Sequence, residues 1–341
     1  MQVRRYDDVW IEGTGSYLPA RRETTTALFG EAAADLITLT GVESRHVAAD
    51  DEATSDLLCH ALRPLTEAPD GSARPVDRLI VATVTPDHPS PGTAPLVAHR
   101  LGLGGPPAYD LTAACAGAIF ALDDAARAIA TGDRRVLVGA AECRFRTLQG
   151  APPGVRVLFG DGAGALSVVG LGSATPPRYP PLRLVATALS SDGSGYDAIK
   201  VPAGGSRMQT TPETIASGLN ALTMEDGAHV FFKAVDGFTS IAADFLAAAG
   251  LSAADIDLVV PHQPNLRILE RVSRRLRIPL ERFQLEVPHI GNVGGASVLI
   301  ALDRALRAGR IQPGQRVLLL TAGAGYTAGV ALLQATDKVT P

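Results

Sequence analysis

The sequence contains few of the residues that mark secreted or metal-binding proteins. It has three cysteines in 341 residues, Cys59, Cys115 and Cys143, which lie far apart and are odd in number. These features exclude a disulfide framework, and the absence of CxxC spacing argues against a zinc site. We therefore expect a reduced, cytoplasmic protein without a bound metal.

Long apolar runs and concentrated positive charge are also absent. No stretch approaches the roughly 20 uncharged residues that a membrane-spanning helix needs, and the first residues carry no signal-peptide core. The net charge is −4, and no basic run is interleaved with aromatic residues. We expect neither a membrane nor a nucleic acid as a partner.

The sequence is instead rich in material for a large core. Hydrophobic residues make up 46% of the chain and charged residues 19%. A chain of this length and composition builds two similar-sized units or one large domain in two parts.

One order of segments occurs twice, about 180 residues apart. An apolar strand is followed by an Ala-rich helix and a second apolar strand, in 79–82, 116–130 and 135–139 and again in 258–261, 296–308 and 316–320. Continuous apolar strands are typical of sheets covered on both faces, and this order predicts α/β halves with right-handed crossovers. We expect two halves, 1–175 and 176–341, related by a pseudo-two-fold axis with a ligand site between them.

Cys115 lies in a run of small residues, Thr112-Ala-Ala-Cys-Ala-Gly-Ala, just before a helical segment. A helix N-terminus offers unpaired N–H groups and a positive dipole end, which stabilise the reactive thiolate. Small neighbours leave room for a substrate. The pattern indicates a nucleophile, although a lone cysteine also serves as a small core residue.

Polar residues of the second half lie in loops that face Cys115 if the halves are related by symmetry. His262 follows the strand 258–261, and Asn292 just precedes the repeat partner of the cysteine position. A Gly-rich piece around Ala324 ends the last long strand, and its N–H groups can join that of Cys115 in an oxyanion hole. We expect these residues to converge at one pocket.

Seven motifs follow one another in a specific order: Gly13-Thr-Gly-Ser-Tyr-Leu-Pro, Thr40-Gly-Val-Glu-Ser-Arg-His, Ala113-Ala-Cys-Ala-Gly, Phe159-Gly-Asp-Gly-Ala-Gly-Ala, Pro261-His-Gln-Pro-Asn-Leu-Arg, Gly291-Asn and Gly323-Ala-Gly-Tyr-Thr. In this order they resemble the 3-oxoacyl-(acyl-carrier-protein) synthase III family of the thiolase superfamily. The resemblance covers the chain nearly end to end.

The resemblance implies a five-layered α/β/α/β/α thiolase-like fold, a homodimer and a Cys-His-Asn active site. Cys115 is expected to hold an acyl group, while the N–H groups of Cys115 and Ala324 bind the oxyanion. His262 and Asn292 are expected to donate hydrogen bonds to the enolate that a malonyl thioester forms on losing CO₂. No cofactor is bound permanently; the substrates are acyl and malonyl thioesters of acyl carrier protein or coenzyme A, and acyl carrier protein is the expected partner.

The chain departs from the family where relatives hold the adenine end of coenzyme A. The usual Trp and Arg positions fall on Asp35 and Leu39, and a second Arg position falls near Pro153. A site without these side chains loses stacking and cation–π contacts. We expect a carrier-protein donor or a different mode of coenzyme A binding, in a specialised enzyme of polyketide, antibiotic or fatty-acid-type biosynthesis.

Two further functions stay open beside condensation. One is acyl transfer from Cys115 to an alcohol or amine of a natural product, with His262 as the base. The other is a non-catalytic subunit that binds acyl chains or carrier protein, although the intact cysteine argues against it. Asn292 favours condensation because it is an amide and not a carboxylate.

Three other residue types are given structural interpretations. Cys59 and Cys143 are predicted to be core residues, and Asp161 is predicted to cap a turn that leads into the next strand. Arg144 and Arg146 are predicted to lie on the surface.

Overall fold

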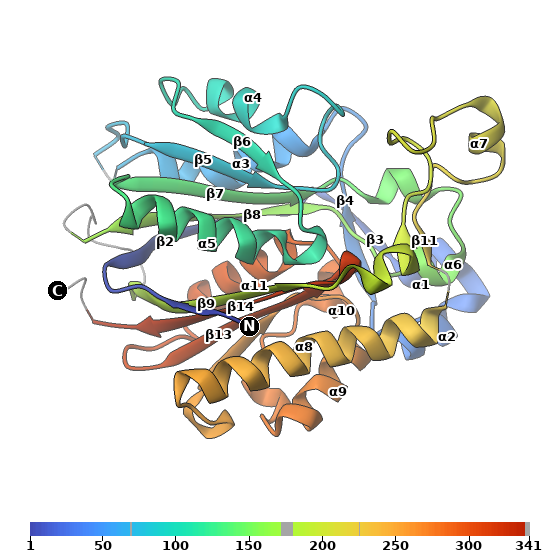
Figure 1. Ribbon diagram of the computed structural model, residues 1–341. Helices are drawn as coiled ribbons and strands as arrows, with labels where there is room; N and C mark the ends of the chain where they lie inside the picture. The colour runs from blue at the N-terminus through green and yellow to red at the C-terminus, as the bar shows by residue number, and fades with distance from the viewer. Residues whose placement is uncertain (69, 172–179, 225, 338–341) are drawn as a thin grey trace.

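Ten strands join into one hydrogen-bonded sheet, in the order β12-β13-β14-β9-β2-β8-β7-β5-β6 with β1 beside β9 (Figure 1). The computed structural model describes residues 1–68, 70–171, 180–224 and 226–337. The strands are β1 (Val3–Arg5), β2 (Val9–Tyr17), β5 (Arg78–Ala82), β6 (Ala108–Leu111), β7 (Arg135–Glu142), β8 (Gly162–Gly170), β9 (Leu182–Ser191), β12 (Leu258–Pro261), β13 (Arg316–Gly323) and β14 (Thr327–Ala335).

Outward from the contact between β2 and β9, the two arms of the sheet repeat one order of strands. One arm is β2-β8-β7-β5 and the other is β9-β14-β13-β12. The pairs β5–β7 and β12–β13 are parallel, and β8 and β14 run antiparallel to their neighbours. The segments that repeat in sequence thus occupy equivalent places. The predicted division between residues 175 and 176 lies outside the described residues and stays a prediction.

Helices and sheet arms form five layers, which confirms the predicted α/β/α/β/α fold (Figure 1). The helices α3 (Thr54–Thr66) and α4 (Thr93–Arg100) cover one outer face, and α8 (Gly227–Ala249) and α9 (Leu266–Leu276) cover the other. The middle layer contains α5 (Gly117–Ala130) and α11 (Ala296–Arg307). Because strands cover this layer on both sides, its helices are buried on nearly all faces.

Equivalent aspartates anchor each central helix to a strand of the opposite half. Asp303 on α11 accepts hydrogen bonds from Thr14 at 2.8 Å and from Ser16 at 2.5 Å, both on β2. Asp123 on α5 accepts from Thr187 on β9 and from Tyr6. Both aspartates belong to the repeated Ala-Leu-Asp motif, so the duplication supplies the hydrogen bonds that join its two copies.

Shorter elements gather at one end of the molecule, the right-hand end in Figure 1. They are α1 (Thr25–Phe29), α2 (Ala33–Thr40), β3 (Arg21–Thr24), β4 (Ser44–Val47), α6 (Pro153–Arg156), β10 (Ile199–Lys200), α7 (Pro212–Ala216), β11 (Thr223–Met224) and α10 (Val287–Ile290). None of the helices in the described part of the chain is long and apolar enough to cross a membrane.

The strand β8 approaches α11 so closely that Gly164 has no room for a side chain. A Cβ atom there would lie 2.5 Å from Leu299 Cβ and 2.9 Å from the backbone N of Ile300. We expect Gly164→Ala to lower the free energy of unfolding by about 1–3 kcal/mol, because the helix backbone must shift. Gly170→Ala, on the same strand, places the new Cβ 3.3 Å from Ile129 Cγ2. Because this contact is with the end of a side chain, the variant should lose less unfolding free energy than Gly164→Ala. Urea unfolding measures both variants, and equal losses would contradict the prediction.

Candidate active site

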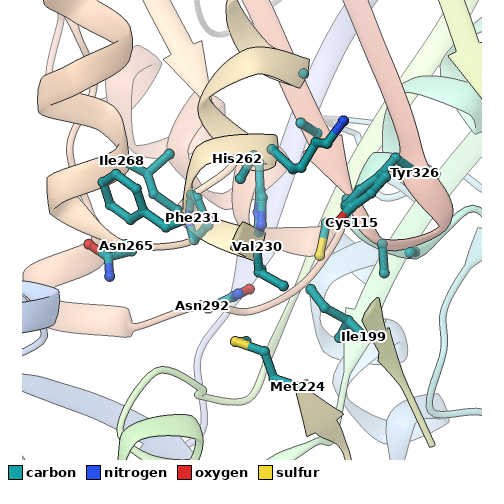
Figure 2. A pocket seen from close by; sticks show the side chains of 18 of the residues that line it. Cys115, Ile199, Met224, Val230, Phe231, His262, Asn265, Ile268, Asn292 and Tyr326 are labelled. Carbon is teal, nitrogen blue, oxygen red and sulfur yellow. The ribbon is translucent and has the colours of Figure 1, made fainter. Parts of the chain in front are cut away.

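A cavity of about 1600 Å³ opens among the short elements, and residues of both halves line it. One wall of the cavity is formed by the loops that follow β6, β7, β12 and β13. These loops lie at the carboxyl ends of the strands, where α/β sheets commonly bind ligands. Cys115, His262, Asn292 and Ala324, the residues expected from the sequence, all border this cavity. Figure 2 shows Cys115, His262 and Asn292 around one space. The structure therefore brings these residues together, while their chemical roles stay predictions.

Tight backbone packing holds Cys115 in a short 3-10 turn, Ala114–Ala116, between β6 and α5. Ala114 has φ +46°, in the left-handed region that side chains other than glycine rarely adopt. The carbonyl of Ala113 accepts a hydrogen bond from Thr327 Oγ1 at 2.9 Å. A Cβ atom at Gly323 would lie 2.7 Å from the backbone N of Cys115. A strained backbone conformation persists only where contacts from neighbouring segments hold it in place. These contacts therefore fix the position of the Cys115 sulfur.

Desolvation dominates the electrostatics of the cysteine. Burial raises the pKa of the Cys115 thiol to about 12, the Glu142 carboxylate adds to the rise, and Arg144 opposes it. The residue keeps intermediate exposure because it borders the cavity, but protein atoms surround the sulfur on its other sides. The sequence predicted a thiolate stabilised by the helix N-terminus. Burial outweighs that effect, so the resting residue is a thiol that loses its proton during attack.

His262 extends β12 and presents a buried, neutral imidazole. Its backbone N–H donates to Leu320 O at 2.8 Å, which continues the parallel pairing with β13. Its Nδ1 lies 2.6 Å from Ser297 Oγ, and its ring is nearly parallel to that of Phe238. Burial lowers the pKa of His262 to about 3, so the ring is uncharged at neutral pH.

The amide of Asn292 has an orientation that its hydrogen bonds assign. Its Oδ1 accepts from the N–H of Gly294 at 2.9 Å, which leaves the NH₂ group as the end available to the cavity. Its backbone N–H donates to Leu158 O at 2.7 Å. Gly291, at φ +66°, would place a Cβ atom 2.8 Å from the same carbonyl. The N–H of Gly160 in turn donates to the Asn292 carbonyl at 3.1 Å. The Phe-Gly-Asp-Gly motif and the residue before it thus support the asparagine, and glycine is required beside it.

Asp161 has a structural role, as predicted, although its carboxylate joins two other segments instead of capping the turn that leads into β8. Its buried carboxylate accepts from the backbone N–H groups of Ala48, Arg144 and Phe145 at 2.7–2.9 Å. These bonds join the segment after β4 to the segment after β7. Cys59 and Cys143 are buried and are not among the described residues that line the cavity.

Glu142 is a cavity residue that sequence reasoning missed. It ends β7, is buried, and accepts hydrogen bonds from Thr85 Oγ1 at 2.8 Å and Val84 N at 3.2 Å. Burial raises its pKa to about 7, against the effects of Arg144 and of these two bonds. A Cβ atom at Gly294 would lie 2.7 Å from Glu142 Cγ, so the carboxyl packs beside the Asn292 loop. The available signal was an acidic residue that closes an otherwise apolar strand.

The prediction that Arg144 and Arg146 lie on the surface is wrong for Arg144. Arg144 is only partly exposed and borders the cavity, because it follows directly on the end of β7. Arg146 is exposed, and its guanidinium donates to the carbonyls of Ala49 and Glu52 at 2.7 Å each.

The mouth of the cavity contains the positions at which the chain departs from the family. Asp35 and Leu39, both on α2, border the opening, and Leu39 is 62% exposed. Pro153 begins α6 next to Gly154, which also borders the cavity. The exposed Phe232 also lines the cavity, and the guanidinium of Arg271 lies 5.1 Å from its ring centroid. The opening thus combines the apolar side chains of Leu39 and Phe232 with the charged side chains of Asp35 and Arg271.

Within the described residues, no group of three or more His, Cys, Asp or Glu side chains is arranged to hold a metal ion.

Comparison with known proteins gives matches to one protein family over most of the chain. The family described as 3-oxoacyl-[acyl-carrier-protein (ACP)] synthase III matches residues 109–193, and its C-terminal part matches residues 246–335. A beta-ketoacyl-[acyl-carrier-protein] synthase III of Xanthomonas campestris pv. campestris is 39% identical over 328 residues, which cover 95% of this chain and 97% of that protein.

Solved structures extend the similarity to the whole fold. A 3-oxoacyl-(acyl carrier protein) synthase III from Pseudomonas aeruginosa is 33% identical, with a TM-score of 0.84, and the match covers 97% of this chain and 99% of that one. A priming beta-ketosynthase from a polyketide biosynthetic pathway is 31% identical, with a TM-score of 0.83 and 99% of both chains covered.

The raised pKa of Glu142 predicts a pH-dependent effect on stability. Its pKa of about 7 in the folded state lies above the ordinary 4.5, so the folded protein binds this proton more tightly than the unfolded chain. That advantage is complete below pH 4.5 and is lost as the pH rises through 7. Glu142→Gln should therefore gain stability relative to the unsubstituted protein between pH 4.5 and 8, by up to about 3 kcal/mol. Urea unfolding at several pH values measures the difference, and a constant difference would contradict the prediction.

Proposed function

We propose that this chain, which belongs to the 3-oxoacyl-[acyl-carrier-protein] synthase III family, condenses an acyl group held on Cys115 with a malonyl thioester. The product is a 3-oxoacyl thioester of fatty-acid or polyketide biosynthesis. The observation that carries this proposal is the amide of Asn292, whose hydrogen bond from Gly294 leaves its NH₂ group for the cavity that Cys115 and His262 also border.

The first half-reaction loads the cysteine. The sulfur of Cys115 attacks the carbonyl carbon of the acyl thioester, and the tetrahedral oxyanion accepts hydrogen bonds from the N–H groups of Cys115 and Ala324. The intermediate collapses to an acyl-cysteine and expels the donor thiol, which takes up the proton that Cys115 lost. The tightly packed turn around Cys115 supports this role for its N–H group, because the hydrogen-bond donors to the oxyanion need a fixed direction.

The second half-reaction forms the carbon–carbon bond. The malonyl thioester loses CO₂, and the enolate oxygen accepts hydrogen bonds from the His262 imidazole and the Asn292 amide. The carbanion attacks the acyl carbon on Cys115, and the carbon–sulfur bond breaks. The released thiolate takes one proton and regenerates the thiol. Burial of the imidazole supports this role, because a neutral ring donates a hydrogen bond without protonating the carbanion.

Transfer to an alcohol or amine has less support. That reaction requires a base that removes a proton from O–H or N–H. Burial lowers the pKa of His262, the expected base, to about 3, which makes its imidazole a weak base. The solved relatives described above are condensing enzymes by name. Condensation is therefore the function the site supports best.

The acyl donor follows from the mouth of the cavity. Asp35 and Leu39 line the cavity at the positions where the family resemblance places the Trp and Arg that hold adenine, so the stacking and cation–π contacts of those two side chains are missing here. We therefore propose acyl carrier protein as the donor and the partner. The homodimer inferred from the family remains part of this proposal.

Separate assays of loading and condensation test the role of Asn292. Asn292→Ala should reduce condensation with a malonyl thioester by about 10²–10³-fold, because one donor to the enolate is lost. Acylation of Cys115, measured by peptide mass, should change less than about tenfold. Cys115→Ala should form no adduct at this peptide, and Cys143→Ala should still load. Equal losses in both half-reactions of Asn292→Ala would contradict the assignment.

Comparison of two donors tests the proposal about the entrance. Acyl carrier protein loaded with a given acyl group should acylate Cys115 faster than the same acyl-coenzyme A. The double variant Asp35→Trp, Leu39→Arg should narrow that difference by lowering the KM for acyl-coenzyme A, since it adds a stacking surface and a cation. If the unsubstituted protein prefers acyl-coenzyme A, the donor assignment fails while condensation stands.

A further inference from the structure

The hydroxyl of Ser297, at the start of α11, contacts the His262 ring at its Nδ1 edge. Ser297 is fully buried. Its Oγ lies 2.6 Å from Nδ1 of His262, accepts from the N–H of Gln263 at 3.1 Å, and lies 2.9 Å from the carbonyl of Gly294. Three polar groups thus compete for one hydroxyl.

The direction of this hydroxyl determines the tautomer of the ring. A serine hydroxyl has one proton to donate and two lone pairs that accept. If it donates to the Gly294 carbonyl, Nδ1 must carry the ring proton in order to bond to Oγ, and Nε2 is left with a lone pair. If it donates to Nδ1, the ring proton lies on Nε2, and Nε2 is a donor.

The contacts favour donation to Nδ1. A separation of 2.6 Å suits an O–H donor, for which about 2.7–2.8 Å is usual, better than an N–H donor, for which about 2.9–3.0 Å is usual. The Gly294 carbonyl does not depend on the hydroxyl, because it also accepts from the N–H of Ser297 at 3.3 Å. Gln263 N–H is satisfied in both arrangements.

We propose that Ser297 is a positioning residue that donates its proton to Nδ1 of His262 and so holds the ring as the Nε2–H tautomer. For its catalytic meaning this inference rests on the proposed condensation, in which His262 donates to the enolate oxygen. Gly294 then contacts the groups that orient both Asn292 and His262. Its N–H donates to the Asn292 amide and fixes the direction of that amide. Its carbonyl is the alternative acceptor for the Ser297 hydroxyl, which in the proposed arrangement donates to Nδ1 of His262 instead.

The tautomer is measurable in the unsubstituted protein, without a variant. In protein labelled with ¹⁵N in its histidine rings, a protonated ring nitrogen has a ¹⁵N shift well separated from that of an unprotonated one. The sequence has seven histidines, and comparison with His262→Gln identifies the signals of His262. At neutral pH we expect Nε2 protonated and Nδ1 unprotonated. The opposite pattern would overturn the inference even if the enzyme condenses normally.

Ser297→Ala tests whether the serine is the cause. Without the hydroxyl, the Gly294 carbonyl is the acceptor that remains near the ring, and a protonated Nδ1 can donate to it. The ring should therefore change to the Nδ1–H tautomer. The kcat of condensation should fall by about 10²–10³-fold with little change in the KM of the malonyl thioester, while loading of Cys115 changes less than tenfold.

A matched control separates this effect from general damage to the core. Ser273, on α9, is buried, donates its hydroxyl to the carbonyl of Ile278 at 2.7 Å, and does not border the cavity. Ser273→Ala should keep the His262 tautomer and the kcat of condensation. Retention of the Nε2–H signal in Ser297→Ala would overturn the inference. If the tautomer depends on Ser297 but the unsubstituted enzyme does not condense, the proposed function fails and the positioning role stands.

Discussion

Close packing of backbone against backbone holds Cys115 and Asn292, two of the residues with proposed catalytic roles, at the wall of one cavity. The turn with Cys115 is pressed by Gly323 from the end of β13, and the loop with Asn292 is pressed by the segment around Leu158 and by Glu142. At positions 291, 294 and 323 a Cβ atom would lie within 3 Å of its neighbours. Such contacts leave no free volume, so a side chain added here displaces a segment that carries a functional group.

The duplicated architecture explains how two distant segments of sequence reach one place. The central helices α5 and α11 pack between the two arms of the sheet, and their N-terminal ends carry Cys115 and the Asn292 loop to the cavity (Figure 1). The buried aspartates of the repeated motif bond each helix to a strand of the other half. Buried charged groups of this kind must be fully hydrogen-bonded, which restricts the angle at which the halves meet.

The dry environment that this packing creates changes the acid–base properties of the site. Burial disfavours the charged forms of Cys115, His262 and Glu142 together. A neutral thiol and a neutral imidazole do not attract a substrate by charge, so in the proposed reaction the oxygen atoms that become negative are stabilised by hydrogen bonds of fixed direction. The orientations of the Asn292 amide and of the His262 ring then matter more than their charges. These orientations are set by Gly294 and Ser297, which do not face the substrate as reactive groups.

The sequence by itself determined the repeat, the α/β halves and the residues that meet in the cavity, because ordered motifs and apolar periodicity are local properties of the chain. The five layers were expected from the resemblance that those motifs carry. Cys115, His262, Asn292 and Ala324 could all be proposed before any coordinates were known. Glu142 and the position of Arg144 could not, since the end of a strand carries no mark of what lies across from it. The thiol state of Cys115 also required the structure: a helix N-terminus is visible in sequence, but the burial that outweighs it comes from segments up to two hundred residues away. The contact between Ser297 and His262 likewise joins two segments, 35 residues apart in sequence, that only folding brings together.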